Sequence, residues 1–194
     1  MDNPTIRLAA LSNPVESNAQ RASIIAVMTA ACITSNYLLI GVVNVKFMDL
    51  IVFVSGFAFG PMVGASVGIM TWLVYGTLNP YGFSLPILIA TSLGESLYGI
   101  AGGLMGNRGT KEIGKGVTAS LKFAITGFLL TFVYDLITNI VSGLSVGIPL
   151  NIALITGLPF AIAHEFSNTA FFFLGALPLI TAIGRLIPRV EKNS

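Results

Sequence analysis

The chain has 194 residues, of which 54% are hydrophobic and 9% are charged, and its formal net charge is +2. Because a soluble domain carries about 25% charged residues, this composition excludes a soluble globular protein and predicts an integral membrane protein. The apolar runs are long and continuous rather than alternating, so the expected fold class is all-α.

The first 20 residues, MDNPTIRLAALSNPVESNAQ, are polar and are interrupted by Pro4 and Pro14. They lack the apolar core of a cleavable signal peptide. We therefore predict a cytoplasmic N-terminal tail over 1–20, a membrane domain over 21–186 and a cytoplasmic C-terminal tail over 187–194.

Membrane-crossing helices need about 20 apolar residues each. The apolar runs that meet this length lie at about 22–40, 85–106, 118–141 and 155–184. Residues 49–78 are compatible with one long kinked helix or with two short helices divided at Gly60-Pro61.

The distribution of basic residues decides between these two interpretations. Nine of the ten Lys and Arg residues lie in three clusters: Arg7 and Arg21; Arg108, Lys111, Lys115 and Lys122; and Arg185, Arg189 and Lys192. Two helices within 49–78 place all three clusters on the cytoplasmic side, as the positive-inside rule favours, whereas one helix does not. The sequence thus predicts six transmembrane helices with both termini in the cytoplasm, and a second helix, about 49–59, too short to cross unaided.

Three loops then face outward, at about 41–48, 76–84 and 142–154. The first of them holds Lys46, the remaining basic residue. Lys46 either pairs with the nearby Asp49 or contacts an anionic group of a ligand.

Polar and ionisable side chains lie beneath these loops at similar depth on three helices. Such side chains are costly inside a membrane and are candidates for function. The pairs at helical spacing are Glu95 with Tyr98, Asp135 with Asn139, and His164 with Asn168. We predict a polar pocket that opens outward and binds a water-soluble ligand; the alternative is that these groups only hydrogen-bond to one another between helices. The candidate binding residues are Lys46, Asp49, Asn79, Glu95, Tyr98, Asp135, Asn139, His164, Glu165 and Asn168.

His164 and Glu165 are adjacent, so they point about 100° apart on a helix. One of them faces the pocket while the other pairs with a neighbouring helix, and the sequence does not decide which. Trp72 lies in the outer third of the third helix, where an interfacial belt residue is expected.

Small residues recur every four positions on two faces, which lets another helix approach closely. One stripe, expected to serve internal packing, consists of Gly56, Gly60, Gly64 and Gly68. The other stripe, which is either internal or a docking surface for a partner protein, consists of Ala22, Ala26 and Ala30.

Several function classes lack their motifs. The chain has no Walker A sequence, no HExxH pair and a single histidine, so we expect no P-loop ATPase activity, no metal site, no cofactor and no enzyme activity. No basic, aromatic-rich patch indicates nucleic acid. The alternatives to a binding protein are a secondary transporter that uses the intramembrane carboxylate of Glu95 or Asp135, an intramembrane enzyme using His164 and Glu165, and a structural partner without a ligand.

Three segments resemble the substrate-binding S component of energy-coupling factor (ECF) vitamin transporters. They are VKFMDLIVFVSGFAFGPMVGASVG (45–68), YGTLNPYGFSLP (75–86) and FVYDLITNIVSG (132–143). With the six helices, the short second helix and the alanine stripe, the resemblance covers about residues 20–185.

This resemblance implies a multi-pass protein of the cell membrane that captures a vitamin or related micronutrient from outside. It implies docking, through Ala22, Ala26 and Ala30, to a membrane coupling protein that works with two cytoplasmic ATPases. It further implies a ligand near the outer ends of helices four to six, with the loop of Lys46 as a lid. Nickel and cobalt S components carry a histidine near the N-terminus; here the chain begins MDNPTIR, which makes metal-ion uptake an unfavourable assignment.

Overall fold

The computed structural model describes residues 17–80, 82–108 and 113–186, and these residues form six helices and no strand. The all-α prediction is therefore confirmed for the described part of the chain. The helices are α1 (Asn18–Leu38), α2 (Met48–Phe59), α3 (Pro61–Leu78), α4 (Leu85–Arg108), α6 (Gly116–Val146) and α7 (Leu150–Leu186). The described residues do not include four members of the predicted cytoplasmic clusters, which are Arg7, Lys111, Arg189 and Lys192. They also do not include 1–16 and 187–194, which belong to the two predicted tails.

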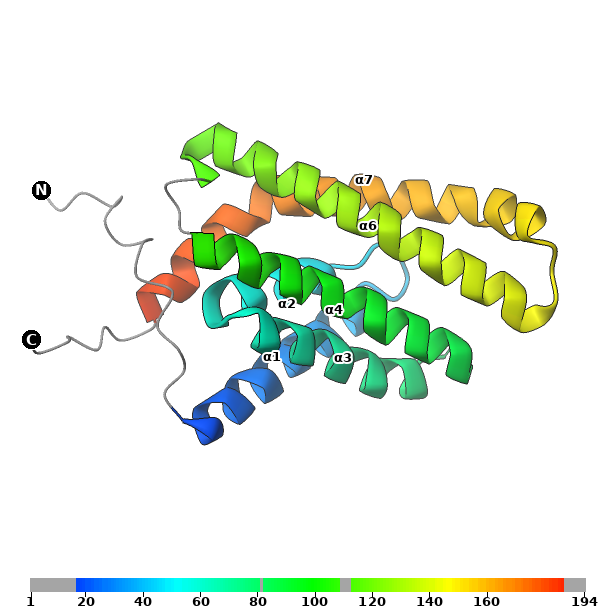
Figure 1. Ribbon diagram of the computed structural model, residues 1–194, viewed down its shortest axis with the longest axis horizontal. Helices are drawn as coiled ribbons and strands as arrows, with labels where there is room; N and C mark the ends of the chain where they lie inside the picture. The colour runs from blue at the N-terminus through cyan, green and yellow to red at the C-terminus, as the bar shows by residue number, and fades with distance from the viewer. Residues whose placement is uncertain (1–16, 81, 109–112, 187–194) are drawn as a thin grey trace, which may run out of the picture.

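The longer helices run roughly along the long axis of the molecule, which is horizontal in Figure 1. Four of them, α3, α4, α6 and α7, are long and apolar enough to cross a membrane, and α2 is a shorter apolar helix. At one end of the bundle lie the beginnings of α1 and α6 and the ends of α4 and α7, with Arg21, Arg108, Lys115 and Arg185. The described basic residues of all three predicted clusters therefore gather at the same end.

Residues 49–78 form two helices, as the charge distribution predicts. Gly60 separates α2 from α3 with φ of 98°, a left-handed conformation that favours glycine. Pro61 is the first residue of α3, a position where its missing N–H costs nothing. Ten of the 12 residues of α2 are buried, so this short helix lies inside the bundle rather than facing lipid along its length.

Glycines allow α2, α3 and α4 to meet at backbone contact. A Cβ atom added to Gly56 would collide with the backbone of Gly99, and one added to Gly64 would collide with both. A Cβ atom on Gly68 would lie 2.9 Å from the backbone of Glu95. The predicted packing role holds for these glycines, whereas Gly60 has open space around it and serves the break between helices.

The hairpin of α6 and α7 extends past the ends of the other helices (Figure 1). The predicted outer loop at 142–154 is wrong in extent, because only residues 147–149 connect the two helices. Gly147 ends α6 in the left-handed conformation with φ of 72°. The prediction assumed helices of membrane-crossing length, but α6 has 31 residues and α7 has 37, since no charge or strong break interrupts the apolar run before Gly147.

Candidate substrate-binding site

A cavity of about 470 Å³ lies at the end of the bundle opposite the basic cluster. All the helices except α2, together with the loop between α1 and α2, contribute to its wall. Its aromatic residues are Trp72, Tyr75, Tyr134 and Phe160, its amide residues are Asn36, Asn44, Asn79 and Asn139, and its charged residues are Lys46 and Asp135. A wall of this kind combines ring faces with hydrogen-bonding groups, as small-molecule sites do.

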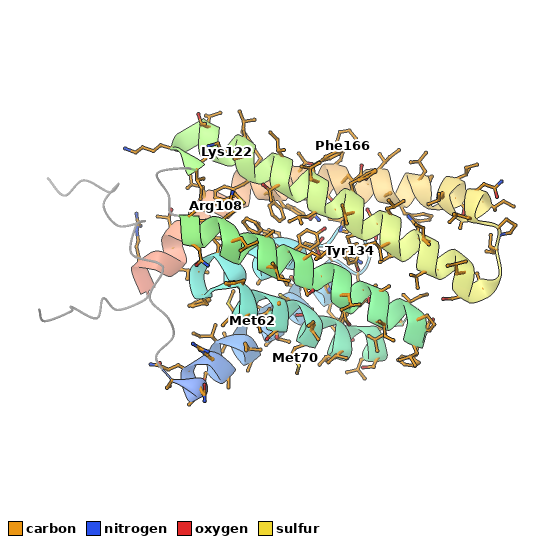
Figure 2. All side chains as sticks on the ribbon, viewed as in Figure 1. Met62, Met70, Arg108, Lys122, Tyr134 and Phe166 are labelled. Atoms are coloured by element: carbon orange, nitrogen blue, oxygen red, sulfur yellow. The ribbon has the colours of Figure 1, made fainter. Side chains whose placement is uncertain are left out.

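Two nearly parallel rings form part of this wall. Trp72 of α3 and Tyr134 of α6 have centroids 6.5 Å apart and an interplanar angle of 29°. Tyr134 lies between α4 and α6 (Figure 2), where Gly94 leaves room for its ring. The indole nitrogen of Trp72 donates to Glu95 Oε2 at 3.3 Å, so Trp72 is held from below and presents its ring to the cavity.

The ammonium of Lys46 lies over both of these rings. Its Nζ atom is 4.7 Å from the Trp72 centroid and 5.5 Å from the Tyr134 centroid. Of the two alternatives for Lys46, an ion pair with Asp49 does not form among the described residues, because Asp49 pairs with His164 instead.

Beneath the cavity lies a buried polar network centred on His164 of α7. Its Nδ1 atom is 2.9 Å from Asp135 Oδ1, and its Nε2 atom is 2.7 Å from Asp49 Oδ2. Asn168, one turn further along α7, donates to Asp49 Oδ2 at 2.5 Å and to Thr131 Oγ1 at 2.8 Å. Three helices, α2, α6 and α7, are thereby tied together by hydrogen bonds between buried side chains.

Tyr98 of α4 joins the same network from the other side. Its hydroxyl donates to Thr131 Oγ1 at 2.9 Å, and Thr131 in turn donates to the carbonyl of Gly127 at 2.8 Å. Tyr98, Glu95 and Thr131 are fully buried, so α4 is linked to α6 and α7 at this depth.

The structure divides the ten predicted site residues into three groups. Four line the cavity: Lys46, Asn79, Asp135 and Asn139. Five are buried beneath it without lining it: Asp49, Glu95, Tyr98, His164 and Asn168. Glu165 belongs to neither group.

The expectation that one of His164 and Glu165 faces the pocket is not met. His164 points into the bundle and pairs with Asp49 and Asp135 of neighbouring helices, and it does not line the cavity. Glu165 is half-buried, and its carboxylate makes no hydrogen bond or ion pair with a described residue. The next residue, Phe166, is 76% exposed and points away from the bundle (Figure 2). The histidine therefore has the interhelical role, and neither residue lines the cavity.

Several wall residues are not among the residues predicted from the sequence. Trp72, interpreted there as a belt residue, is 8% exposed and lines the cavity. Asn36 lies at the end of α1, and Tyr134 precedes Asp135, so both are close to polar positions that the hydropathy pattern does reveal. Tyr134 could have been found from its spacing of one turn before Thr138, another wall residue.

The loop that carries Lys46 is attached to α7. Asn44 adopts a positive φ of 55°, and its Nδ2 atom donates to the carbonyl of Phe160 at 2.8 Å. Both residues line the cavity, so this contact joins two parts of its wall.

The alanine stripe of α1 is on the surface. Ala22, Ala26 and Ala30 are all exposed, so they are not packed inside the part of the bundle that the structure describes. They lie on the half of α1 nearer the basic end of the bundle.

The four candidate membrane-crossing helices indicate a multi-pass membrane protein. The cavity at one end of the bundle has the size of a small-molecule site. Residues 16–185 match the family model of the ECF-type riboflavin transporter, S component, and the chain belongs to this family. The resemblance to an ECF S component is thus confirmed. No curated protein and no solved structure matches the chain.

Proposed function

We propose that this chain is the substrate-binding subunit of an ECF importer in the cell membrane, and that its cavity binds a riboflavin-type vitamin from outside. The observation that carries the proposal is a cavity of about 470 Å³ with both ring faces and amides on its wall, in a chain of the riboflavin S-component family. Ligand cavities commonly measure about 300–1,000 Å³.

The chemistry of a flavin suits this wall. A flavin combines a planar ring system with an edge of carbonyl and N–H groups and a chain of hydroxyls. Trp72 and Tyr134 offer aromatic surface next to the Lys46 ammonium that lies over them. The amide of Asn139 and the hydroxyl of Thr138 offer hydrogen bonds nearby.

Nine of the ten site residues act in one of two ways in this proposal. Lys46, Asn79, Asp135 and Asn139 face the ligand, and the buried group of Asp49, Glu95, Tyr98, His164 and Asn168 holds the wall in place. Glu165 is left without a role toward the ligand.

The proposed topology has six membrane-embedded helices, 21–186, with both terminal tails in the cytoplasm. The gathering of Arg21, Arg108, Lys115 and Arg185 at one end supports this orientation. The cavity then opens to the outside, and the loop of Lys46 covers it as a lid.

Release to the inside depends, in this proposal, on a membrane coupling protein and cytoplasmic ATPases. The exposed alanines of α1 supply the docking surface, because small side chains permit close contact between helices.

Two measurements test the proposal together. The purified chain in detergent should bind riboflavin at one molecule per chain, measured by quenching of the vitamin's fluorescence. In liposomes, uptake should require the coupling module and ATP. Uptake driven by an ion gradient with this chain alone would instead favour a secondary transporter, and a chain that binds riboflavin in neither setting would refute the riboflavin assignment.

A further inference from the structure

Lys46 is the positively charged residue of the described wall, and its N–H donors are unused. The described wall carries two charged side chains, Lys46 and Asp135. Asp135 Oδ1 is engaged by His164 Nδ1 at 2.9 Å. The Lys46 ammonium makes no hydrogen bond or ion pair with any residue that the structure describes, and lies instead over the rings of Trp72 and Tyr134.

Ring faces leave this ammonium able to bind an oxygen. A ring attracts a cation through its quadrupole but does not use up the three N–H donors of a lysine. A ligand that enters the cavity can therefore accept a hydrogen bond from Lys46 while the rings stay in contact with it.

The buried acids Asp49 and Glu95 attract Lys46 electrostatically, but neither forms an ion pair with it. Asp49 is 1% exposed and its Oδ2 atom already accepts from His164 and Asn168. Glu95 is fully buried and accepts from the indole of Trp72. Neither residue lines the cavity, so the positive charge at this point of the wall faces the ligand.

We propose that Lys46 determines the class of ligand by binding a carbonyl or anionic oxygen on the edge of a planar ring that lies against Trp72 and Tyr134. This inference rests on the proposed function and restricts the proposed ligands to those with such an oxygen on the ring. A cationic ring is disfavoured, because its charge would meet the ammonium in a cavity of low dielectric constant. In riboflavin, the oxygen is one of the two carbonyls of the pyrimidine ring.

The first test compares riboflavin affinity between variants in the purified full chain. Lys46→Met should weaken binding about 10- to 100-fold, the range expected for loss of a charged hydrogen bond. Lys46→Arg, which keeps the charge and the donors, should recover most of that loss. The matched control is Lys115→Met, an exposed lysine at the start of α6 at the opposite end of the bundle, and it should bind as wild type does.

The second test separates a contact with the ligand from a change in protein stability. Riboflavin analogues with sulfur in place of one carbonyl oxygen, the 2-thio and 4-thio forms, accept hydrogen bonds weakly. For one of these analogues, Lys46→Met should change the affinity by no more than about twofold, because the hydrogen bond between Lys46 and the replaced oxygen is already absent. An equal loss for riboflavin and both analogues would overturn the inference.

The two proposals can fail separately. If the wild type binds riboflavin and Lys46→Met binds it equally well, the inference is wrong and the proposed function stands. If the wild type binds no riboflavin, the substrate assignment is wrong, and titration with nicotinate and thiamine decides the role of Lys46. If the wild type prefers nicotinate, which carries a carboxylate, and Lys46→Met abolishes that preference, the inference is supported. If the wild type binds thiamine, which carries a cationic ring, or if wild type and variant bind alike, the inference is overturned.

Discussion

The Nε2 atom of His164 lies 2.7 Å from the Oδ2 atom of Asp49, which stands 115 positions earlier in the chain. The other ring nitrogen lies 2.9 Å from Asp135, and a doubly protonated ring satisfies both contacts as donor. This one side chain joins α2 to α6, beneath a cavity whose wall includes the loop that precedes α2. Stability of the bundle and shape of the cavity are therefore linked through His164.

Removing Asp49 should destabilise the protein strongly. Asp49→Asn leaves His164 and Asn168 with donors that face an amide instead of a carboxylate, and breaking a buried charged pair costs about 3–5 kcal/mol. Thermal unfolding of the purified protein in detergent measures the effect. Glu165→Gln, a carboxyl change outside the network, is the control and should shift stability by no more than about 0.5 kcal/mol; equal shifts in both variants would contradict the network's role.

Asp135→Asn should weaken riboflavin binding more than it lowers stability. The buried network contains two aspartates, Asp49 and Asp135, and of these two Asp135 lines the cavity. We expect about tenfold weaker affinity, the loss typical of one charged hydrogen bond. Titration of wild type, Asp135→Asn and Glu165→Gln checks this, and unchanged affinity in Asp135→Asn would show that the carboxylate does not face the ligand.

The chain has one tryptophan, Trp72, and it lines the cavity. Ligand binding should therefore quench the intrinsic tryptophan emission with a saturation curve that matches the affinity from flavin fluorescence. The Trp72→Phe variant loses the tryptophan emission, but it should still bind the ligand through its smaller ring. Saturable binding with no change in tryptophan emission would place the ligand elsewhere.

Gly99→Ala should be poorly tolerated. A Cβ atom there would collide with the backbone of Gly64 and Ala65, and overpacking of this kind costs about 1–3 kcal/mol. Gly41→Ala is the matched control, because nothing lies within 4 Å of its added Cβ atom. A lower unfolding temperature for Gly99→Ala alone is the expected result; no difference between the two would mean that the helices separate freely.

Ala26→Leu should impair assembly with the coupling module without changing ligand affinity of the isolated chain. Ala26 is exposed on α1, and a longer side chain would hold a partner helix away. Co-purification with the coupling protein measures assembly. Ile125→Phe, a change at a 59% exposed residue of α6, controls for added bulk on the surface, and normal assembly of Ala26→Leu would argue against docking through this stripe.

The sequence by itself determines the class of fold. Apolar runs, the Gly60-Pro61 break and the basic clusters predict six helices, because a bilayer demands long apolar helices and backbone conformation at glycine and proline is local. It also identifies Asp135, His164 and Asn168 as neighbours in depth, since polar side chains stand out against an apolar helix.

Only the tertiary structure decides which polar residues meet and which line the cavity. The rotation of each helix depends on packing between helices, for example the close approach of Gly64 and Gly99, and no short segment carries that information. Packing turns His164 inward and Glu165 outward, buries Asp49 under the wall, and brings Trp72 to Tyr134 and Lys46. Aromatic residues escape notice in the sequence because they are as common in a packed membrane core as at a binding site, and only contact distinguishes the two.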